Sequence, residues 1–143
     1  MGGLTGYITD QDAERDGVWA NEWDGFQIRI ARVGPMNRTA YKITQKIVKS
    51  GRGTGSSPET DLRNTVELCV EGLVKGWRTY KEGEWHDSLI QNLDDPEGPL
   101  IPFTKDVLRK VLVAIPDLAA DIQYFALQQG NYAREVLDEA VGE

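Results

Sequence analysis

The sequence has few of the residues that usually carry catalysis or covalent cross-links. It contains one cysteine, Cys69, and one histidine, His86, among 143 residues. A single cysteine excludes an intramolecular disulfide, and its position within an apolar stripe favours a buried, unreactive thiol. One histidine among scattered carboxylates lacks the ligand spacing of known metal sites. We therefore expect no metal, no other cofactor and no catalytic residues, so the protein is predicted not to be an enzyme.

Long hydrophobic runs are also missing. No apolar stretch approaches the roughly 18–20 residues that would cross a bilayer, and the first residues lack the basic and apolar regions of a secretory signal. We expect a soluble protein without a membrane partner. The length corresponds to one domain with a hydrophobic core of its own.

Acidic residues are absent from one part of an otherwise acidic chain. The net charge is −7, yet residues 29–52 contain seven Lys or Arg and no Asp or Glu, whereas residues 1–28 contain six acids and one base. The acidic total, and the lack of a recognised helix-turn-helix or aromatic and basic sheet pattern, argue against nucleic-acid binding. We expect the basic block to meet acidic segments within one copy or between copies, the latter in a homo-oligomer. Assembly of the second kind should loosen as salt rises.

The longest helical pattern covers residues 61–77. Its apolar residues recur at spacings of three and four, which predicts one amphipathic helix: Leu62, Val66, Cys69, Val70, Leu73, Val74 and Trp77. Ser57 and Pro58 are suited to its cap and first turn. Gly72 and Gly76 lower helix propensity, so we expect another element to approach the helix closely there.

Other local signals place the remaining elements around this helix. Residues 1–16 read as a flexible arm, and residues 17–33 as a β-hairpin turning at Asp24-Gly25. Asn37 is predicted to cap a helix that runs to about Ser50. A flexible loop at 51–57 follows, and a long loop at 79–103, which is either functional or contains a short helix near residues 85–93.

Two further helices complete the prediction. Thr104 is typical of an N-cap for a helix over residues 105–115, and Pro116 starts the last helix. A weaker apolar stripe at residues 132–140 indicates either a partner-binding helix or a fraying end. The predicted fold class is therefore mainly α with a small N-terminal β-hairpin, a compact domain of about four helices over residues 17–141.

A succession of short motifs resembles one protein family. They are Gly25-Phe26-Gln27-Ile28-Arg29-Ile30-Ala31-Arg32, Val70-Glu71-Gly72-Leu73-Val74-Lys75-Gly76-Trp77, Gly98-Pro99-Leu100-Ile101-Pro102-Phe103-Thr104, and a helix from Val107-Leu108 to Leu112 closed by Pro116-Asp117-Leu118. In this order, over residues 18–135, the chain resembles the tail assembly chaperones of long-tailed (siphovirus-type) bacteriophages. The loop between the Gly-Trp and Ile-Pro-Phe motifs is longer here than is usual in the family.

The resemblance implies a non-catalytic role in tail assembly. Such chaperones bind the hydrophobic, helical tape-measure protein, keep it soluble and assist polymerisation of the tail-tube protein, in some phages through a longer frameshifted form. The resemblance implies a location in the host cell cytoplasm and absence from the mature virion. The residues predicted to contact a partner or another copy are Phe26, Ile28, Leu73, Trp77 and Phe103, although each also suits a plain core.

Two alternatives remain open at this point. The chain could be a virion structural protein of the tail or neck, such as a tail-completion or adaptor protein that stays in the particle. It could also be a small enzyme or host-directed regulator. The only support for this alternative is His86, with Asp87 and the neighbouring acidic residues.

Overall fold

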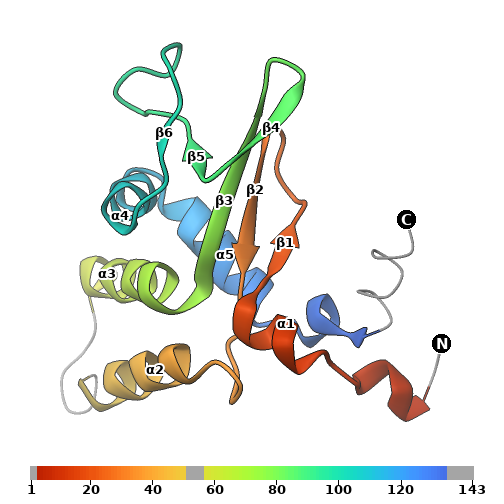
Figure 1. Cartoon of the computed structure of the whole chain (residues 1–143). Coiled ribbons are helices and arrows are strands. Elements are labelled where there is room, and N and C mark those ends of the chain that lie inside the picture. The colour runs from red at the N-terminus through yellow and green to blue at the C-terminus, as the bar shows by residue number, and fades with distance from the viewer. Residues whose placement is uncertain (1–2, 51–56, 135–143) are drawn as a thin grey trace.

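The chain folds as a sheet with helices packed on one of its sides. The computed structural model describes residues 3–50 and 57–134. Four antiparallel strands form the sheet in the order β1-β2-β3-β4: β1 (Val18–Ala20), β2 (Phe26–Ile30), β3 (Val74–Lys81) and β4 (Glu84–Asp87). Two short strands, β5 (Leu89–Ile90) and β6 (Ile101–Pro102), pair separately. Figure 1 shows β2 and β3 as the long central pair, with α5 behind them.

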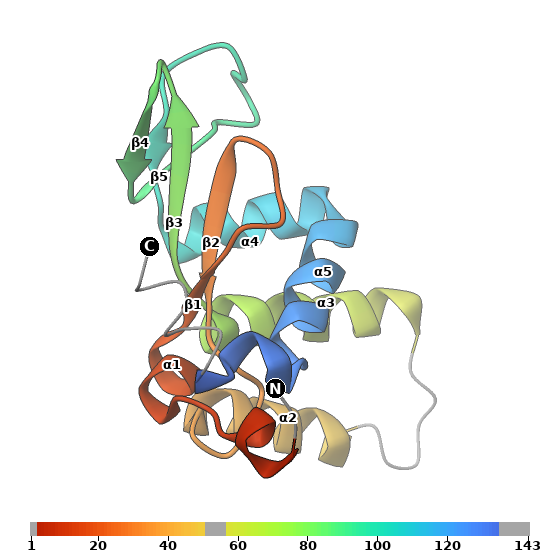
Figure 2. The ribbon, with the colours of Figure 1, turned by 90° about the vertical axis from the view of Figure 1, so that its right-hand side faces the viewer.

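The helices come from three parts of the chain. They are α1 (Gln11–Asp16), α2 (Arg38–Ser50), α3 (Pro58–Leu68), α4 (Lys105–Ala114) and α5 (Pro116–Ala126), with 3-10 turns η1 (Gly3–Tyr7) and η3 (Gln129–Tyr132) and a π-helical turn η2 (Cys69–Leu73). Figure 2 shows α3, α4 and α5 on the same side of the sheet. Among the described residues no helix is long and apolar enough to span a membrane.

The predicted fold class is wrong. The described part of the chain is α+β, with a four-stranded antiparallel sheet and five α-helices, rather than a mainly helical domain with a small hairpin. The reason lies at one point of the chain. The predicted helix over residues 61–77 ends as an α-helix at Leu68, widens into η2, and continues as strand β3 from Val74.

We attribute the change from helix to strand to a close contact with α2. A Cβ on Gly72 would lie 3.0 Å from Ala40 Cα and 3.2 Å from its Cβ, so any larger residue here would require α2 to shift. The carbonyls that lack a partner at the end of the helix accept hydrogen bonds from residues distant in the sequence. Asn37 Nδ2 donates to Gly72 O at 2.7 Å, and Ala31 N donates to Leu73 O at 2.8 Å. These distant partners satisfy the orphan carbonyls of a helix end. The expectation that another element approaches closely at Gly72 is thus confirmed. The approach occurs where the helix ends, however, and not along a continuing helix.

Strand β3 turns directly into β4, within the segment predicted to be a long loop. The two-residue turn has positive φ at both positions, 56° at Glu82 and 82° at Gly83, as the hairpin-favouring turns require. The rest of residues 79–103 holds β5 and β6, and the short helix suggested near residues 85–93 is absent from this described segment. The sequence did contain a strand signal here, because residues that favour strands, Thr79, Tyr80 and Trp85, flank the turn at Glu82-Gly83. It was overlooked because the preceding residues have helical spacing.

Several local predictions are confirmed. β1 and β2 form the N-terminal hairpin, with Ile28 and Ile30 fully buried toward the helices. Ala40 N donates to Asn37 Oδ1, Thr60 N to Ser57 Oγ and Val107 N to Thr104 Oγ1, so all three predicted N-caps are made. Helix α5 starts at Pro116. Of the predicted loop at 51–57, residues 51–56 lie outside the described residues, as do residues 135–140 of the C-terminal stripe.

The segment predicted to be a flexible arm is instead joined to the C-terminal end of the described chain. Asp10 N donates to Tyr132 O at 3.0 Å and Arg134 N to Ile8 O at 2.8 Å. Glu14 on α1 is buried and forms an ion pair with Arg32. A buried carboxylate needs such a partner, so the arm contributes to packing rather than standing apart.

Candidate functional site: an apolar cleft beside the sheet

A cleft opens between the helix-facing side of the sheet and the junction of α4 and α5. Its volume is about 370 Å³. The lining is mainly apolar and includes five polar or charged residues, Asp24, Thr79, Tyr80, Lys81 and Gln91. The other lining residues are Gly25, Phe26, Trp77, Ile90, Leu93, Pro96, Leu100, Val111, Ile115 and Leu118. Ligand pockets commonly measure roughly 300–1,000 Å³ and are lined in this way. The cleft can therefore accept apolar side chains.

Four aromatic rings stack in one row, and its two central rings, Phe26 and Trp77, line this cleft. Trp23 and Phe26 lie 5.4 Å apart between ring centroids, Phe26 and Trp77 5.0 Å, and Trp77 and Phe103 6.3 Å. The first two pairs are tilted by only 8° and 5°. Such contacts stabilise beyond the burial of area, so they favour this arrangement of the four rings.

The structure separates the five predicted contact residues into two groups. Phe26, Trp77 and Phe103 lie together in the aromatic row, and the first two line the cleft. Ile28 and Leu73 are both 0% exposed and belong to the core. A partner can reach Phe26 and Phe103, which are half-buried, without unfolding the domain. Whether they contact a partner stays a prediction.

One wall of the cleft is a loop, residues 91–100, that the other elements hold in place. It contributes Leu93, Pro96 and Leu100. Lys81 Nζ donates to Gly98 O at 3.0 Å, and an ion pair joins Lys110 on α4 to Asp94. The longer segment noted in the sequence between the Gly-Trp and Ile-Pro-Phe motifs therefore supplies part of the cleft.

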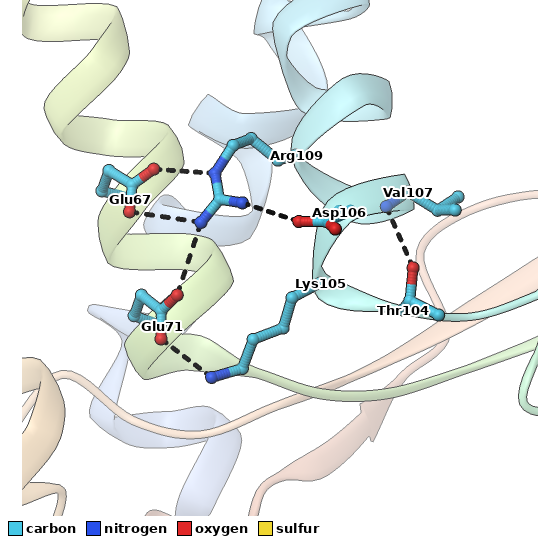
Figure 3. Close-up of polar contacts among 7 residues, drawn as sticks. All are labelled: Glu67, Glu71, Thr104, Lys105, Asp106, Val107 and Arg109. Atoms are coloured by element: carbon cyan, nitrogen blue, oxygen red, sulfur yellow. Dashed lines mark hydrogen bonds and ion pairs between the residues drawn. The ribbon is translucent and has the colours of Figure 1, made fainter.

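A group of ion pairs fixes α4, which carries the opposite wall, against α3 and η2. In Figure 3 Arg109 reaches Glu67 and Glu71, and Lys105 reaches Glu71 as well. The Arg109 Nε to Glu67 Oε1 and Lys105 Nζ to Glu71 Oε2 distances are both 2.8 Å. The hydrogen bond from Lys105, with the charges of Lys105 and Arg109, lowers the pKa of the Glu71 carboxyl. The Lys105 pair is solvent-exposed and the Arg109 pairs are partly exposed, so they orient α4 more than they stabilise the fold.

Cys69 and His86 are both accounted for by their surroundings. Cys69 is fully buried, which raises the pKa of its thiol to about 12, as predicted for an unreactive cysteine. His86 lies on β4 with Nε2 3.1 Å from Lys81 O and 3.8 Å from Glu84 Oε1. No group of three or more His, Cys, Asp or Glu that could hold a metal occurs in residues 3–50 and 57–134.

The sequence prediction missed a second aromatic group, on the other face of the sheet. The Arg78 guanidinium lies over two rings, 4.4 Å from the Trp19 centroid and 5.0 Å from that of Trp85. Tyr80 packs edge-on against Trp85 at 5.2 Å. The sheet therefore carries an aromatic and basic combination that the sequence analysis did not find. It could be found only by recognising β3 and β4, which bring Tyr80 opposite Trp85.

Comparison with known proteins adds no relative. No family model, curated protein or solved structure matches this chain.

Proposed function

We propose that this protein is a tail assembly chaperone of a long-tailed bacteriophage. It binds apolar helical segments of the tape-measure protein in the host cytoplasm, keeps that protein soluble, and leaves before the virion is complete. The chain itself does no catalysis. A longer frameshifted form would bring in the tail-tube protein.

The observation that carries this proposal is the apolar cleft bounded by the aromatic row. A long helical protein with exposed apolar side chains aggregates unless those side chains are covered. An amphipathic helix can place anchors spaced three or four residues apart into a preformed apolar groove. Phe26 and Trp77 on the sheet, and Val111, Ile115 and Leu118 from the α4–α5 region, offer two such walls. The motif succession that resembles the chaperone family includes residues from both walls.

Co-expression tests the proposal. The chain is produced together with apolar helical segments of the longest coiled-coil-like protein encoded in the same genome, and soluble recovery of each segment is measured with and without the chain. The proposal expects a segment that is insoluble alone to co-purify with the chain. Failure of every segment to become soluble or to co-purify would contradict it.

A matched pair of variants locates the binding surface. Ile115 lines the cleft and is 40% exposed, and it occupies the N-cap position of α5, where aspartate is favourable. Ile115→Asp should therefore keep the fold and abolish co-purification. Val113 is also exposed but does not line the cleft, so Val113→Asp should leave co-purification intact. Equal behaviour of the two variants would move the binding surface elsewhere.

Finished particles distinguish the chaperone from the structural alternative. Mass spectrometry of purified virions should not detect this chain at the stoichiometry of a tail component. Its stoichiometric presence would contradict the chaperone role and support a tail or neck protein.

A further inference from the structure

We propose that the exposed face of α2 binds the acidic residues 135–143 of the same chain. This face, the basic face of α2, consists of four bases with two apolar side chains beside them: Arg38, Lys42, Lys46, Lys49, Tyr41 and Val48. The residues that line the cleft come from other elements, so the inference does not rest on the proposed function.

The charges of α2 are concentrated on one side of the helix. The four bases are exposed and follow one another at spacings of four, four and three residues, which places them on one face. Tyr41 and Val48, 55% and 52% exposed, lie two turns apart beside these bases. The opposite side of the helix is occupied, because Ala40 is fully buried and Ile43 packs against the core. Figures 1 and 2 both show α2 at the lower edge of the described chain, with α3 above it.

The basic face carries charge that nothing in the described part of the chain neutralises. Bases four residues apart on a helix repel one another, and residues 29–52 contain no acid that could offset this repulsion. In the same basic block, Arg32 does pair with the buried Glu14. Within residues 3–50 and 57–134, however, none of the four bases of α2 forms an ion pair. The face is therefore suited to an anionic ligand.

The surroundings of the face decide between anionic ligands. A helix that lies on a lipid surface inserts its apolar side, but the apolar side of α2 is part of the core. A nucleic acid would use the bases for its phosphates, yet it would gain little from Val48, and the chain outside residues 29–52 is strongly acidic. A short acidic protein segment with apolar side chains uses the whole face, because its carboxylates meet the bases and its apolar groups cover Tyr41 and Val48.

The chain itself contains a segment of this composition. Residues 135–143, which lie outside the described residues, contain four acids, no base and four apolar residues: Glu135, Asp138, Glu139, Glu143, Val136, Leu137, Ala140 and Val141. The segment is thus complementary to the basic face in charge and in apolar character.

The bases on the side of the sheet opposite the helices are already engaged. Arg78 Nε donates to Gln27 Oε1 at 2.7 Å, and its guanidinium lies over two tryptophan rings. Arg29 and Lys75 both lie near the carboxylate of Asp16. The basic face of α2 is therefore the better site for an acidic segment.

Short contacts connect the start of α2 to the point from which this segment continues. Tyr132 O accepts from Asp10 N at 3.0 Å, and one turn of α1 later Glu14 O accepts from Arg32 N at 2.9 Å. Arg32 O accepts in turn from Nδ2 of Asn37, the N-cap of α2, at 3.1 Å. Nine extended residues span at most about 30 Å. Residues 135–143 can therefore reach the first turns of α2 in their own copy.

A spin label on the segment tests the contact in the full chain. A nitroxide attached to Gly142→Cys broadens the amide NMR signals of nearby residues, while Cys69 is fully buried and stays unlabelled. At low salt the signals of α2 should broaden, and the broadening should fade as salt rises, because exposed charges are screened. Sharp α2 signals at low salt would overturn the proposal. So would broadening in unlabelled, isotope-enriched chains mixed with spin-labelled chains, since the contact would then join two copies.

Charge reversal locates the contact. Arg38→Glu with Lys42→Glu should abolish the broadening of α2, because acids would then face acids. Arg38 is the first residue of α2, where glutamate is favourable, so this variant should fold. Lys75→Glu with Lys110→Glu changes the net charge equally at two other exposed positions and should leave the broadening intact. Equal effects of the two double variants would overturn the proposal, since the contact would then depend on net charge alone.

Two further measurements test the nature of the ligand. Tyr41→Ser with Val48→Ser should reduce the broadening of α2, whereas Val113→Ser with Tyr124→Ser, at exposed apolar positions elsewhere, should not. Unchanged broadening in the first variant would contradict the use of the whole face. Tight binding of a labelled oligothymidine that removes the broadening of α2 would overturn the proposal and assign the face to a nucleic acid.

Discussion

The two faces of the sheet use the same kinds of residue for opposite purposes. Trp77 on the inner face is 4% exposed and lies in the row with Phe26 and Phe103, whereas Trp19 and Trp85 on the outer face, the side opposite the helices, are 37% and 41% exposed. The inner rings stack on one another; the outer rings enclose the Arg78 guanidinium. Aromatic content alone therefore does not distinguish core from surface. The pleat of β2 and β3 assigns neighbouring residues to one role or the other.

The largest expected difference between the faces concerns stability. Ile28→Ala removes a fully buried side chain from the inner face and should lower the free energy of unfolding by roughly 2–5 kcal/mol. Trp19→Ala on the outer face should cost clearly less, since the ring is more than a third exposed. Urea denaturation of both variants measures this. A larger loss for Trp19→Ala would mean that the outer face is part of the core of the folded unit.

The two glycines at the helix-to-strand junction provide a smaller contrast. Gly72→Ala forces a Cβ to within 3.0 Å of the α2 backbone and should destabilise by about 1–3 kcal/mol. Gly76→Ala meets only side-chain atoms, at 3.5 Å from Trp19 and 3.7 Å from Arg29, and should change stability by less than about 1 kcal/mol. Thermal unfolding of the pair measures the contrast. Equal tolerance at both positions would contradict the proposed cause of the change from helix to strand.

The smallest expected effect is the dependence of stability on alkaline pH. Burial raises the pKa of the Cys69 thiol to about 12. The unfolded chain therefore releases this proton first, near pH 8.5–9, and stability falls as pH rises from there toward 12. The loss should reach roughly 1–2 kcal/mol by pH 10. Urea denaturation between pH 7 and 10 should give a flatter profile for Cys69→Ala than for the unaltered chain; parallel profiles would contradict this assignment.

Local features of this fold could be predicted because their causes are local. A side-chain oxygen at Asn37, Ser57 or Thr104 caps a helix with a backbone N–H three residues away, and Pro116 starts a helix through its own ring geometry. The β1–β2 hairpin follows from alternation in Phe26, Ile28 and Ile30. Three of the five predicted contact residues, Phe26, Trp77 and Phe103, also lie together, because large aromatic side chains are stabilised by packing against one another.

The sheet and the outer face were decided by contacts between distant parts of the chain. Residues 61–77 have helical spacing throughout. This spacing alone cannot show that Gly72 packs against Ala40. Nor can it show that Asn37 and Ala31 donate hydrogen bonds to the last carbonyls of the helix. Once these partners end the helix, Trp77 pairs with Ile28 and Arg78 reaches the other side of the sheet between two tryptophans. Helix propensity contributes only tenths of a kcal/mol per residue. Tertiary packing and the bonding of buried carbonyls outweigh it, and both depend on residues more than thirty positions apart.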